Sequence, residues 1–229
     1  MGYGGWVLAL ILVQWLVIRV ILVIPVFGAP NDSILGASSG EGRESLRLFV
    51  FLGSGGHTGE MLRLLENYKD VLLKPGTRLT VGVSDDASLQ RFDQTLGREL
   101  RRSQVEIKVC RFGKAREVGA SRLQSVKSIS ATLVKAIGTL TWIKWTFVRQ
   151  PHLVLLNGPG TCCIIGGWLK FLEVVTMTRS KIVYVESLAR TSSLSMSGKI
   201  LYPLVDEFVV QWEELCDVYD RARCFGILV

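Results

Sequence analysis

Histidine is scarce in this sequence, and the cysteines follow no metal-binding pattern. Only two histidines, His57 and His152, occur among the 229 residues. The five cysteines are odd in number and form no Cys-x-x-Cys pair. Because a structural zinc site needs about four clustered Cys or His ligands, we expect no metal site. The odd number also argues against a disulfide framework, so we expect reduced thiols in a cytosolic environment.

Acidic residues are scarce in the middle of the chain. Eleven Lys or Arg residues and only two acids lie between Arg101 and Arg149, in a chain of formal net charge +7. This concentration favours an anionic partner such as a phospholipid surface, a diphosphate or a nucleic acid, although a solvated basic face explains it equally well. The length and the 48 % hydrophobic content suit one domain with an appendage and exclude two complete Rossmann domains.

A long apolar run lies near the start of the chain. Residues 6–27 contain Arg19 as their only charged residue, and about 20 residues at 1.5 Å per residue cross a bilayer core. A cleaved signal peptide is the alternative, but no Lys or Arg precedes the run, which is longer than the usual apolar h-region of a signal peptide. We therefore predict a membrane anchor at 1–27, a flexible tether at 28–45 and one folded domain at 46–229.

The basic residues near the anchor lie on one side of it. Arg43, Arg47 and Arg63 follow the apolar run, whereas the first five residues contain no Lys or Arg. The positive-inside rule then places the folded domain in the cytosol. Arg19 would be costly in mid-membrane, so we expect it to reach a headgroup or to find a partner.

The folded region alternates short apolar runs with longer helical patterns, which predicts an α/β fold. We expect a single Rossmann-like, doubly wound, mostly parallel sheet covered on both faces. The strands are predicted at 46–52, 78–83, 105–110, 151–157, 181–186 and 207–211, and the helices at 58–69, 88–100, 121–147, 161–175 and 197–204. The end of the third helix, 142–147, is aromatic and basic, which fits either core packing or a membrane interface.

The carboxyl ends of parallel strands meet at one sheet edge, so the loops after the first, fourth and fifth strands should converge. The first of these loops comprises Gly53, Ser54, Gly55, Gly56, His57 and Thr58. Its glycines let a diphosphate approach the backbone, and the helix that follows presents free N–H groups. A nicotinamide cofactor, with Asp85 or Asp86 on its ribose, is a weaker alternative, because little chain remains for a substrate region. His57 either handles a proton or ligand, or only caps the helix.

Two further loops reach the same edge. The fourth strand is followed by a second glycine loop, which is either one side of a phosphate cradle or a simple tight turn; it comprises Asn157, Gly158, Pro159, Gly160 and Thr161. The fifth strand ends at Glu186 and Ser187. Glu186 either orients sugar hydroxyls, acts as a base or only pairs with Arg190. Arg190 and the nearby hydroxyls otherwise suit phosphate oxygens.

Four motifs together resemble one family. They are Gly-Ser-Gly-Gly-His-Thr at 53–58, Asn-Gly-Pro-Gly-Thr-Cys at 157–162, Val-Tyr-Val-Glu-Ser at 183–187 and Leu-Ser-Met-Ser-Gly-Lys at 194–199. The set resembles the membrane-anchoring subunit of the two-subunit UDP-N-acetylglucosamine transferase of dolichol-linked oligosaccharide synthesis, the pathway of protein N-linked glycosylation. The resemblance implies the N-terminal, acceptor-side half of a split GT-B glycosyltransferase. A more distant resemblance to the bacterial transferase that glycosylates lipid I points to His57 and Glu186.

The resemblance also implies the reaction and the partners. The expected reaction is inverting transfer of the second N-acetylglucosamine to dolichyl-diphosphate-GlcNAc at the cytosolic face of the endoplasmic reticulum membrane. UDP-GlcNAc would be a substrate, bound mainly by a separate soluble subunit, with no cofactor and no nucleic acid involved. His57 and Glu186 would be catalytic, and the two glycine loops, Ser187 and Arg190 would bind substrate. A purely recruiting, non-catalytic chain is the alternative.

The chain ends in an apolar segment that the same resemblance explains. An exposed apolar end is unfavourable for a free chain, so we expect it to pack into the soluble subunit. The segment includes Phe225, Gly226, Ile227, Leu228 and Val229.

Overall fold

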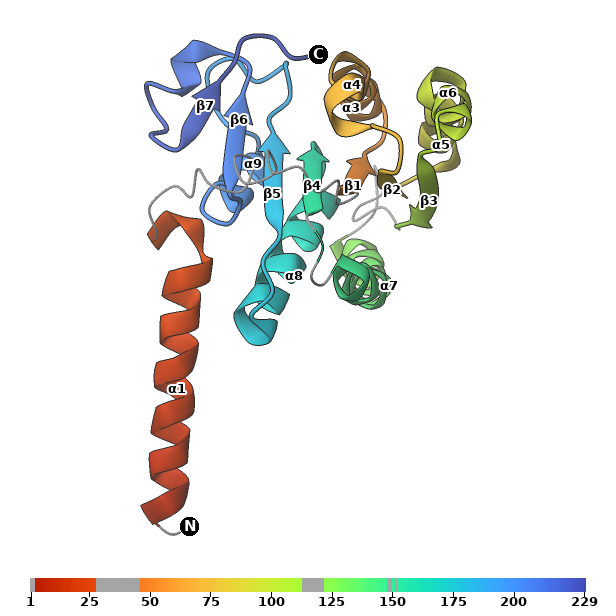
Figure 1. The fold of residues 1–229 in the computed structure, drawn as a ribbon. Coiled ribbons are helices and arrows are strands. Elements are labelled where there is room, and N and C mark those ends of the chain that lie inside the picture. Colours follow the sequence, from red (N-terminus) through yellow and green to blue (C-terminus); the bar gives the residue numbers. More distant parts are fainter. Residues whose placement is uncertain (1–2, 28–45, 113–121, 148–149, 151) are drawn as a thin grey trace, which may run out of the picture.

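A seven-stranded parallel sheet forms the centre of the folded domain (Figure 1). The computed structural model describes residues 3–27, 46–112, 122–147, 150 and 152–229, so the predicted tether at 28–45 lies outside the described residues. The strand order is β3-β2-β1-β4-β5-β6-β7, and every neighbouring pair is parallel. The strands are β1 (Arg47–Leu52), β2 (Arg78–Val83), β3 (Glu106–Arg111), β4 (His152–Asn157), β5 (Lys181–Val185), β6 (Glu207–Val210) and β7 (Ala222–Cys224).

The sheet confirms the predicted fold class and adds one strand to the prediction of six. The order runs outward in both directions from β1 and β4, as in doubly wound sheets. The added strand is β7, a three-residue edge strand that pairs with β6 through Phe208 and Ala222. It follows the short 3-10 helix η4 (Glu213–Leu215). Its Ala-Arg-Cys sequence has no apolar run, which is why the periodicity missed it.

Helices cover both faces of the sheet and separate two hydrophobic cores. One face carries α3 (Gly56–Asn67), α4 (Lys69–Leu72), α5 (Asp86–Phe92), the π-helix η3 (Asp93–Gly97) and α6 (Arg98–Arg102). The other carries α7 (Arg122–Phe147), α8 (Thr161–Thr176) and α9 (Met196–Leu201). Burial on both sides explains why the central strands read as nearly continuous apolar runs. In place of the single helix predicted at 88–100, the structure has three contiguous helical segments, α5, η3 and α6.

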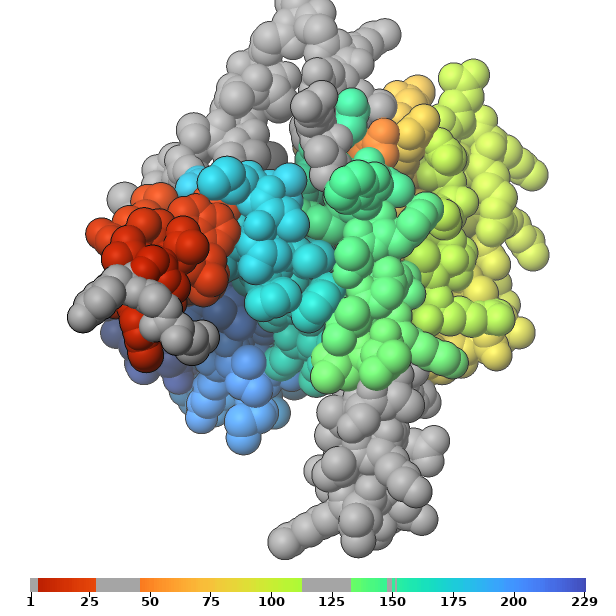
Figure 2. All heavy atoms as spheres, turned by 90° about the horizontal axis from the view of Figure 1, so that it is seen from below, coloured from red at the N-terminus to blue at the C-terminus, as the bar shows by residue number. Residues whose placement is uncertain are grey.

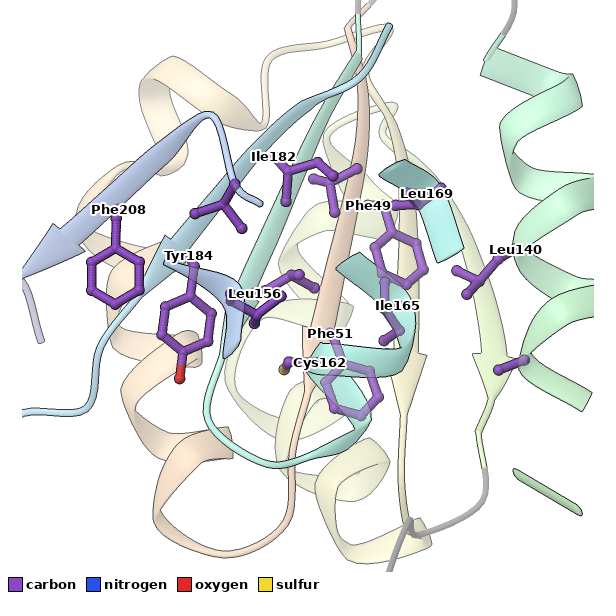
Figure 3. Packing of buried hydrophobic residues seen from close by; sticks show 14 of the residues in the cluster. Phe49, Phe51, Leu140, Leu156, Cys162, Ile165, Leu169, Ile182, Tyr184 and Phe208 are labelled. Carbon is purple, nitrogen blue, oxygen red and sulfur yellow. The ribbon is translucent and has the colours of Figure 1, made fainter. Parts of the chain in front are cut away.

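The core under α7 and α8 is rich in aromatic rings (Figure 3). Phe49 and Phe51 point to this side from β1, and both rings meet Phe112 edge-to-face, at 6.1 and 5.8 Å between centroids. Tyr184 of β5 stacks on Phe208 of β6 at 5.3 Å. These buried rings fix the register of the central strands and hence the height of the loops that follow them.

The N-terminal helix α1 (Tyr3–Val23) projects from the domain and ends in a short 3-10 turn, η1 (Pro25–Phe27) (Figure 1). It is long and apolar enough to cross a membrane, as predicted. Arg19 has a protein partner: its Nε donates to Val174 O at 3.0 Å, and Nη2 donates to Glu173 O. Arg179, which follows α8, makes a second hydrogen bond to α1: its Nη2 donates to Leu22 O at 3.2 Å. The last turns of α1 are therefore fastened to the C-terminal end of α8.

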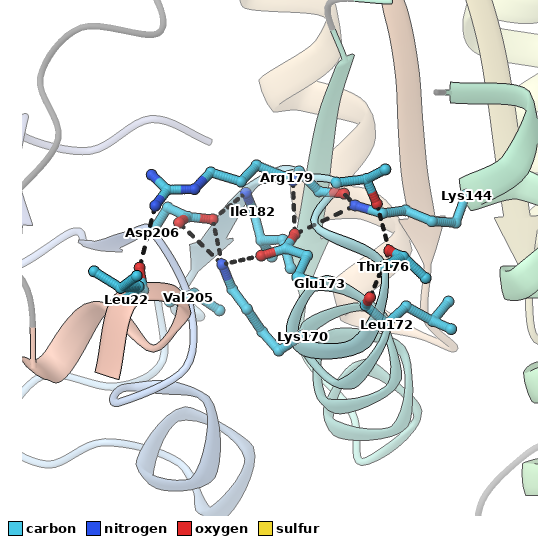
Figure 4. A network of polar contacts seen from close by, with 12 residues as sticks. Leu22, Lys144, Lys170, Leu172, Glu173, Thr176, Arg179, Ile182, Val205 and Asp206 are labelled. Carbon is cyan, nitrogen blue, oxygen red and sulfur yellow. Dashed lines mark hydrogen bonds and ion pairs between the residues drawn. The ribbon is translucent and has the colours of Figure 1, made fainter. Parts of the chain in front are cut away.

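A buried ionic network lies beside this contact (Figure 4). Lys170 Nζ is 3.0 Å from both Glu173 Oε2 and Asp206 Oδ1, and Lys144 Nζ is 3.5 Å from Glu173 Oε1. Ser180 donates its backbone N–H to Glu173 Oε1 at 2.6 Å. Burial raises the pKa of Glu173, although the charges of Lys170 and Lys144 lower it. Burial lowers the pKa of Lys144, although its interaction with Glu173 raises it. The network ties α7 and α8 to the starts of β5 and β6.

Candidate active site

The loops after β1 and β4 lie against each other at the carboxyl edge of the sheet. A Cβ built on Gly53 would lie 2.7 Å from Pro159 Cδ, and one built on Gly158 would lie 2.3 Å from His57 Cγ. Gly158 also has a φ of +97°. Neither position accepts a side chain without displacement, so the glycines allow the two loops and the His57 ring to meet. The two loops converge as the sequence predicts.

Two helices begin at this junction with glycine in the cap position. α3 follows Gly55 and α8 follows Gly160, so neither start has a side-chain cap. The first-turn N–H groups and the positive ends of both helix dipoles are thus presented at one edge. Gly55, Gly56 and Gly160 are exposed, which leaves room for an anion to approach the backbone.

The threonines of the two loops are buried. Thr58 and Thr161 are 0 % and 2 % exposed. The Thr58 hydroxyl donates to Gly53 O and contacts Ser88 Oγ at 2.8 Å. The Thr58 hydroxyl therefore stabilises the conformation of the first loop from its buried side. The predicted substrate contact of both threonines stays a prediction.

Asn157 fixes the orientation of the His57 ring. Asn157 Nδ2 donates to Glu60 Oε2 at 2.9 Å and to Val185 O at 3.1 Å. With both N–H groups of the amide committed, its Oδ1 lies 3.1 Å from His57 Nδ1 and accepts a hydrogen bond from the Nδ1–H group. This assignment follows from the hydrogen-bond network. In the neutral ring, Nε2 then carries the lone pair.

Glu60 is the site residue that sequence reasoning did not select. Its Oε1 accepts from Ser187 Oγ at 2.7 Å, and its Oε2 lies 3.9 Å from His57 Nδ1. The interaction with Glu60 raises the pKa of His57, against an opposite effect of burial. Burial by itself raises the pKa of Glu60, but its hydrogen bonds to His57, Ser187 and Asn157 outweigh this, and the net pKa is lowered. The i,i+3 spacing of His57 and Glu60 on one helix was the available signal.

Glu186 is built into the loop after β5. Its side chain is buried, and its carboxylate accepts from Ser187 N, Ser195 N and Ser195 Oγ, each at 3.0 Å. A Cβ on Gly198 would lie 2.2 Å from Glu186 Oε2. Glu186 is thus hydrogen-bonded to its own loop and not to Arg190, which is exposed at the site edge. Its predicted catalytic role stays a prediction.

In the part of the chain that it describes, the structure gives no support to a metal site, to a nicotinamide site at Asp85 or to a role for the second histidine at this edge. Across the described ranges, no group of three or more His, Cys, Asp or Glu is placed to hold a metal ion. Asp85, the acid proposed for a nicotinamide ribose, caps α5 by accepting from Ser88 N at 2.8 Å. The second histidine, His152, begins β4 and so lies at the opposite, amino-terminal edge of the sheet, where its Nε2 is 2.8 Å from Ser180 Oγ. Burial lowers the pKa of His152 to about 4.

The C-terminal segment divides into exposed and packed residues. Phe225 and Ile227 are 65 % and 61 % exposed. Leu228 and Val229 instead pack against the core beneath α3. The Leu228 backbone is held at both ends: its N–H donates to Gln211 Oε1 at 3.2 Å, and its carbonyl accepts from Asn67 Nδ2 at 3.1 Å. Phe225, Gly226 and Ile227 are thus the exposed residues of the segment, and the side chains of Phe225 and Ile227 are available to a partner.

Comparison with known proteins gives a consistent match. Residues 48–228 match the family described as "Oligosaccharide biosynthesis protein Alg14 like". A relative from Saccharomyces cerevisiae, named UDP-N-acetylglucosamine transferase subunit ALG14, is 49 % identical over 233 residues, covering 97 % of both chains. A relative of the same name from Kluyveromyces lactis is 46 % identical over 231 residues, covering 98 % of both chains.

Solved structures with a similar fold are much more distant in sequence. MurG from Acinetobacter baumannii aligns with a TM-score of 0.44 and 14 % identity, over 72 % of this chain and 41 % of that chain. UGT89C1 from Arabidopsis thaliana aligns with a TM-score of 0.46 and 13 % identity, over 82 % and 51 % respectively. At such identities the likeness says nothing of function.

Proposed function

Because the chain belongs to the Alg14-like family of oligosaccharide biosynthesis proteins, we propose that it is the acceptor-side subunit of a UDP-N-acetylglucosamine transferase. The proposed acceptor is dolichyl-diphosphate-GlcNAc, and the product carries the second N-acetylglucosamine of the N-glycan precursor. The observation that carries the proposal is the His57 ring, oriented by Asn157 beside two helix starts with glycine caps.

The size of the domain supports a shared active site. One Rossmann-like sheet offers a single carboxyl edge, whereas a GT-B enzyme binds its nucleotide sugar between two such domains. The second domain is proposed to be the soluble subunit, which would hold UDP-GlcNAc. The relatives' own name, a transferase subunit, agrees with this division. The exposed side chains of Phe225 and Ile227 offer a contact for that subunit.

The geometry supports a direct displacement with His57 as the base. The acceptor 4-hydroxyl oxygen forms a bond to the anomeric carbon of UDP-GlcNAc while the bond from that carbon to the UDP oxygen breaks. UDP leaves with the electron pair, and the hydroxyl proton passes to His57 Nε2. Attack opposite the leaving group inverts the anomeric centre. Asn157 and Glu60 hold the ring in the tautomer that this step needs.

The acceptor diphosphate fits the N-terminal ends of α3 and α8. Backbone N–H groups and two helix dipoles supply positive potential there, and exposed Arg190 adds a guanidinium that can take phosphate oxygens in two parallel hydrogen bonds. Glu186 supports this site by holding the loop that carries Ser187 and Ser195. The anchor α1 would hold the domain at the cytosolic face of the endoplasmic reticulum membrane.

A reconstituted assay tests the proposal against a purely recruiting chain. Each subunit alone and both together are given UDP-GlcNAc and a short-chain lipid diphosphate-GlcNAc acceptor. We expect activity from the pair only, and its loss with His57→Ala in complexes that still form. Full activity of the His57→Ala pair would leave this chain a recruiter. Binding of a nicotinamide cofactor by the isolated chain, checked by titration, would favour the oxidoreductase alternative.

A further inference from the structure

An apolar surface of α7 and α8 has no function in the proposed reaction. On α7, Val134, Trp142 and Trp145 are 70 %, 46 % and 80 % exposed, and on α8, Phe171 and Val175 are 51 % and 41 % exposed. Residues 134, 141 and 145 recur on one side of α7, and 168, 171 and 175 recur on one side of α8. We call this surface the α7–α8 face; it comprises Val134, Thr141, Trp142, Trp145, Trp168, Phe171 and Val175.

The two helices contribute to one continuous surface. Trp168 stacks on Phe171 with 4.9 Å between ring centroids. The indole Nε1 of Trp168 donates to Thr141 Oγ1 on α7 at 3.0 Å. The stacked rings of α8 therefore lie against α7, and exposed apolar surface on neighbouring helices is of the kind that marks an interaction site.

The two helices of this surface expose no acidic side chain. The sequence of α7 contains no Asp or Glu, and the only acid of α8, Glu173, is 1 % exposed and paired with Lys170. A cation lies at the edge of the face, because Lys108 Nζ is 3.4 Å from the centroid of the Trp142 ring. Exposed tryptophan and phenylalanine beside lysine, on two helices that expose no acid, suit the headgroup region of an anionic bilayer.

The position of the anchor points to the same partner. Seen from the side toward which α1 projects, α1, α8 and α7 lie side by side (Figure 2). Arg19 and Arg179 fasten α1 to the end of α8. In Figure 1, α7 is seen nearly end-on, whereas α1 is seen from the side along its length, so α7 runs across the direction of α1. A membrane that α1 crosses would therefore run along α7.

We propose that the α7–α8 face lies in the headgroup layer of the anionic bilayer that α1 crosses. The folded domain is then seated on the membrane by this face and by the Arg19 contact. Its active-site edge, at the start of α8, keeps a fixed height above the lipid. The proposal rests on α1 crossing a membrane, and it does not depend on the transferase reaction.

The test places a nitrobenzoxadiazole probe on single introduced cysteines of the full chain in vesicles that contain phosphatidylserine. Trp145→Cys reports on the α7–α8 face. Val71→Cys is the matched control, because Val71 is 65 % exposed on α4, which packs on the opposite face of the sheet. The unsubstituted chain gives the background from its native cysteines. Phe171→Cys is a second reporter if Trp145→Cys fails to fold.

We expect the probe at 145 to lose quenching by aqueous iodide and to be quenched by lipids that carry a nitroxide near the headgroup. The probe at 71 should remain open to iodide. Equal iodide quenching at 145, or at 171 in its place, and at 71 would overturn the proposal. Protection that appears only when the soluble subunit is added would assign the face to that partner instead. Release of the chain by alkaline carbonate would remove the premise that α1 spans the membrane, and the proposal with it.

Discussion

The amide oxygen of Asn157 lies 3.1 Å from Nδ1 of His57, across two loops that are 100 residues apart in the chain. The amide cannot turn over without losing its two donated hydrogen bonds, to Glu60 and to Val185 O. Asn157, in the loop after β4, thereby sets the orientation of the His57 imidazole in the loop after β1. The neutral His57 ring is consequently preset with its free lone pair on Nε2, as the proposed base requires.

Replacing Asn157 should damage catalysis more than folding or acceptor binding. Asn157→Ala removes the acceptor for His57 Nδ1–H, so the ring loses its fixed tautomer. We expect kcat to fall by roughly 10- to 100-fold with little change in acceptor KM, and His57→Ala to lower it by roughly 100-fold or more. His152→Gln is the control, because that ring lies at the opposite edge. A change in KM alone after Asn157→Ala would contradict this role.

The activity of the pair should depend on the protonation state of His57. A base must be neutral, so kcat/KM should rise with pH through a pKa above the ordinary 6.5, since the interaction with Glu60 raises it. Glu60→Gln removes that charge, and the rising limb should move to lower pH. The pKa of His152, near 4, lies below this range. A limb that does not move in Glu60→Gln would show that another group titrates.

The same pKa predicts a small effect on folding. A histidine whose folded-state pKa is raised stabilises the fold most fully below its unfolded pKa, and this contribution is lost as pH rises through the folded value. Between these limits, the thermal midpoint of the wild type should fall with increasing pH more steeply than that of His57→Gln. Parallel midpoint curves for the two proteins would contradict the raised pKa.

The glycine loop after β4 offers a matched pair of alanine substitutions. At Gly158, the new Cβ would lie 2.3 Å from His57 Cγ, and the φ of +97° is strained for alanine. We expect Gly158→Ala to cost about 1–3 kcal/mol in unfolding free energy and to displace the His57 ring. At Gly160, nothing lies within 4 Å of an added Cβ, and φ is −53°. Gly160→Ala should therefore fold normally, as circular dichroism melts would show.

Much of the fold, and the meeting of the two glycine loops, could be predicted from the sequence because local sequence patterns specify them. The apolar runs of β1 and β4 and the glycines that end them predict both the sheet and the meeting of the two loops. Arg19 could be assigned a need for a partner, since a charge in an apolar helix demands one. The identity of that partner, the carbonyl end of α8, depends on tertiary packing.

The residues that were missed depend on contacts between distant segments. Glu60 is one polar residue among many on a surface helix until Ser187 and Asn157 are brought against it. Similarly, β7 exists because β6 offers an edge, and its own three residues carry no strand pattern. Lys144 lies in the aromatic and basic end of α7, yet it is 4 % exposed and paired with Glu173. Sequence periodicity does not distinguish such a lysine from one in water.

The buried ionic network should be sensitive to the loss of its only shared acid. Glu173→Ala leaves Lys170 with Asp206 alone and Lys144 without a carboxylate, in an interior that penalises unpaired charge. We expect a loss of about 3–5 kcal/mol in unfolding free energy, measured by denaturant or heat in detergent. Glu99→Ala breaks only an exposed pair with Lys69 and should change little. Equal effects of the two substitutions would contradict the importance assigned to burial.

The division of the C-terminal segment makes partner binding separable from folding. Phe225 and Ile227 are exposed, so replacing both by alanine should leave the melting temperature unchanged while reducing co-purification of the soluble subunit by at least about tenfold. Leu228→Ala should instead lower the melting temperature, because Leu228 packs against the core beneath α3. Val218→Ala, at an equally exposed site, is the control for surface truncation. Undiminished complex formation by the Phe225 and Ile227 double variant would exclude this segment as the partner contact.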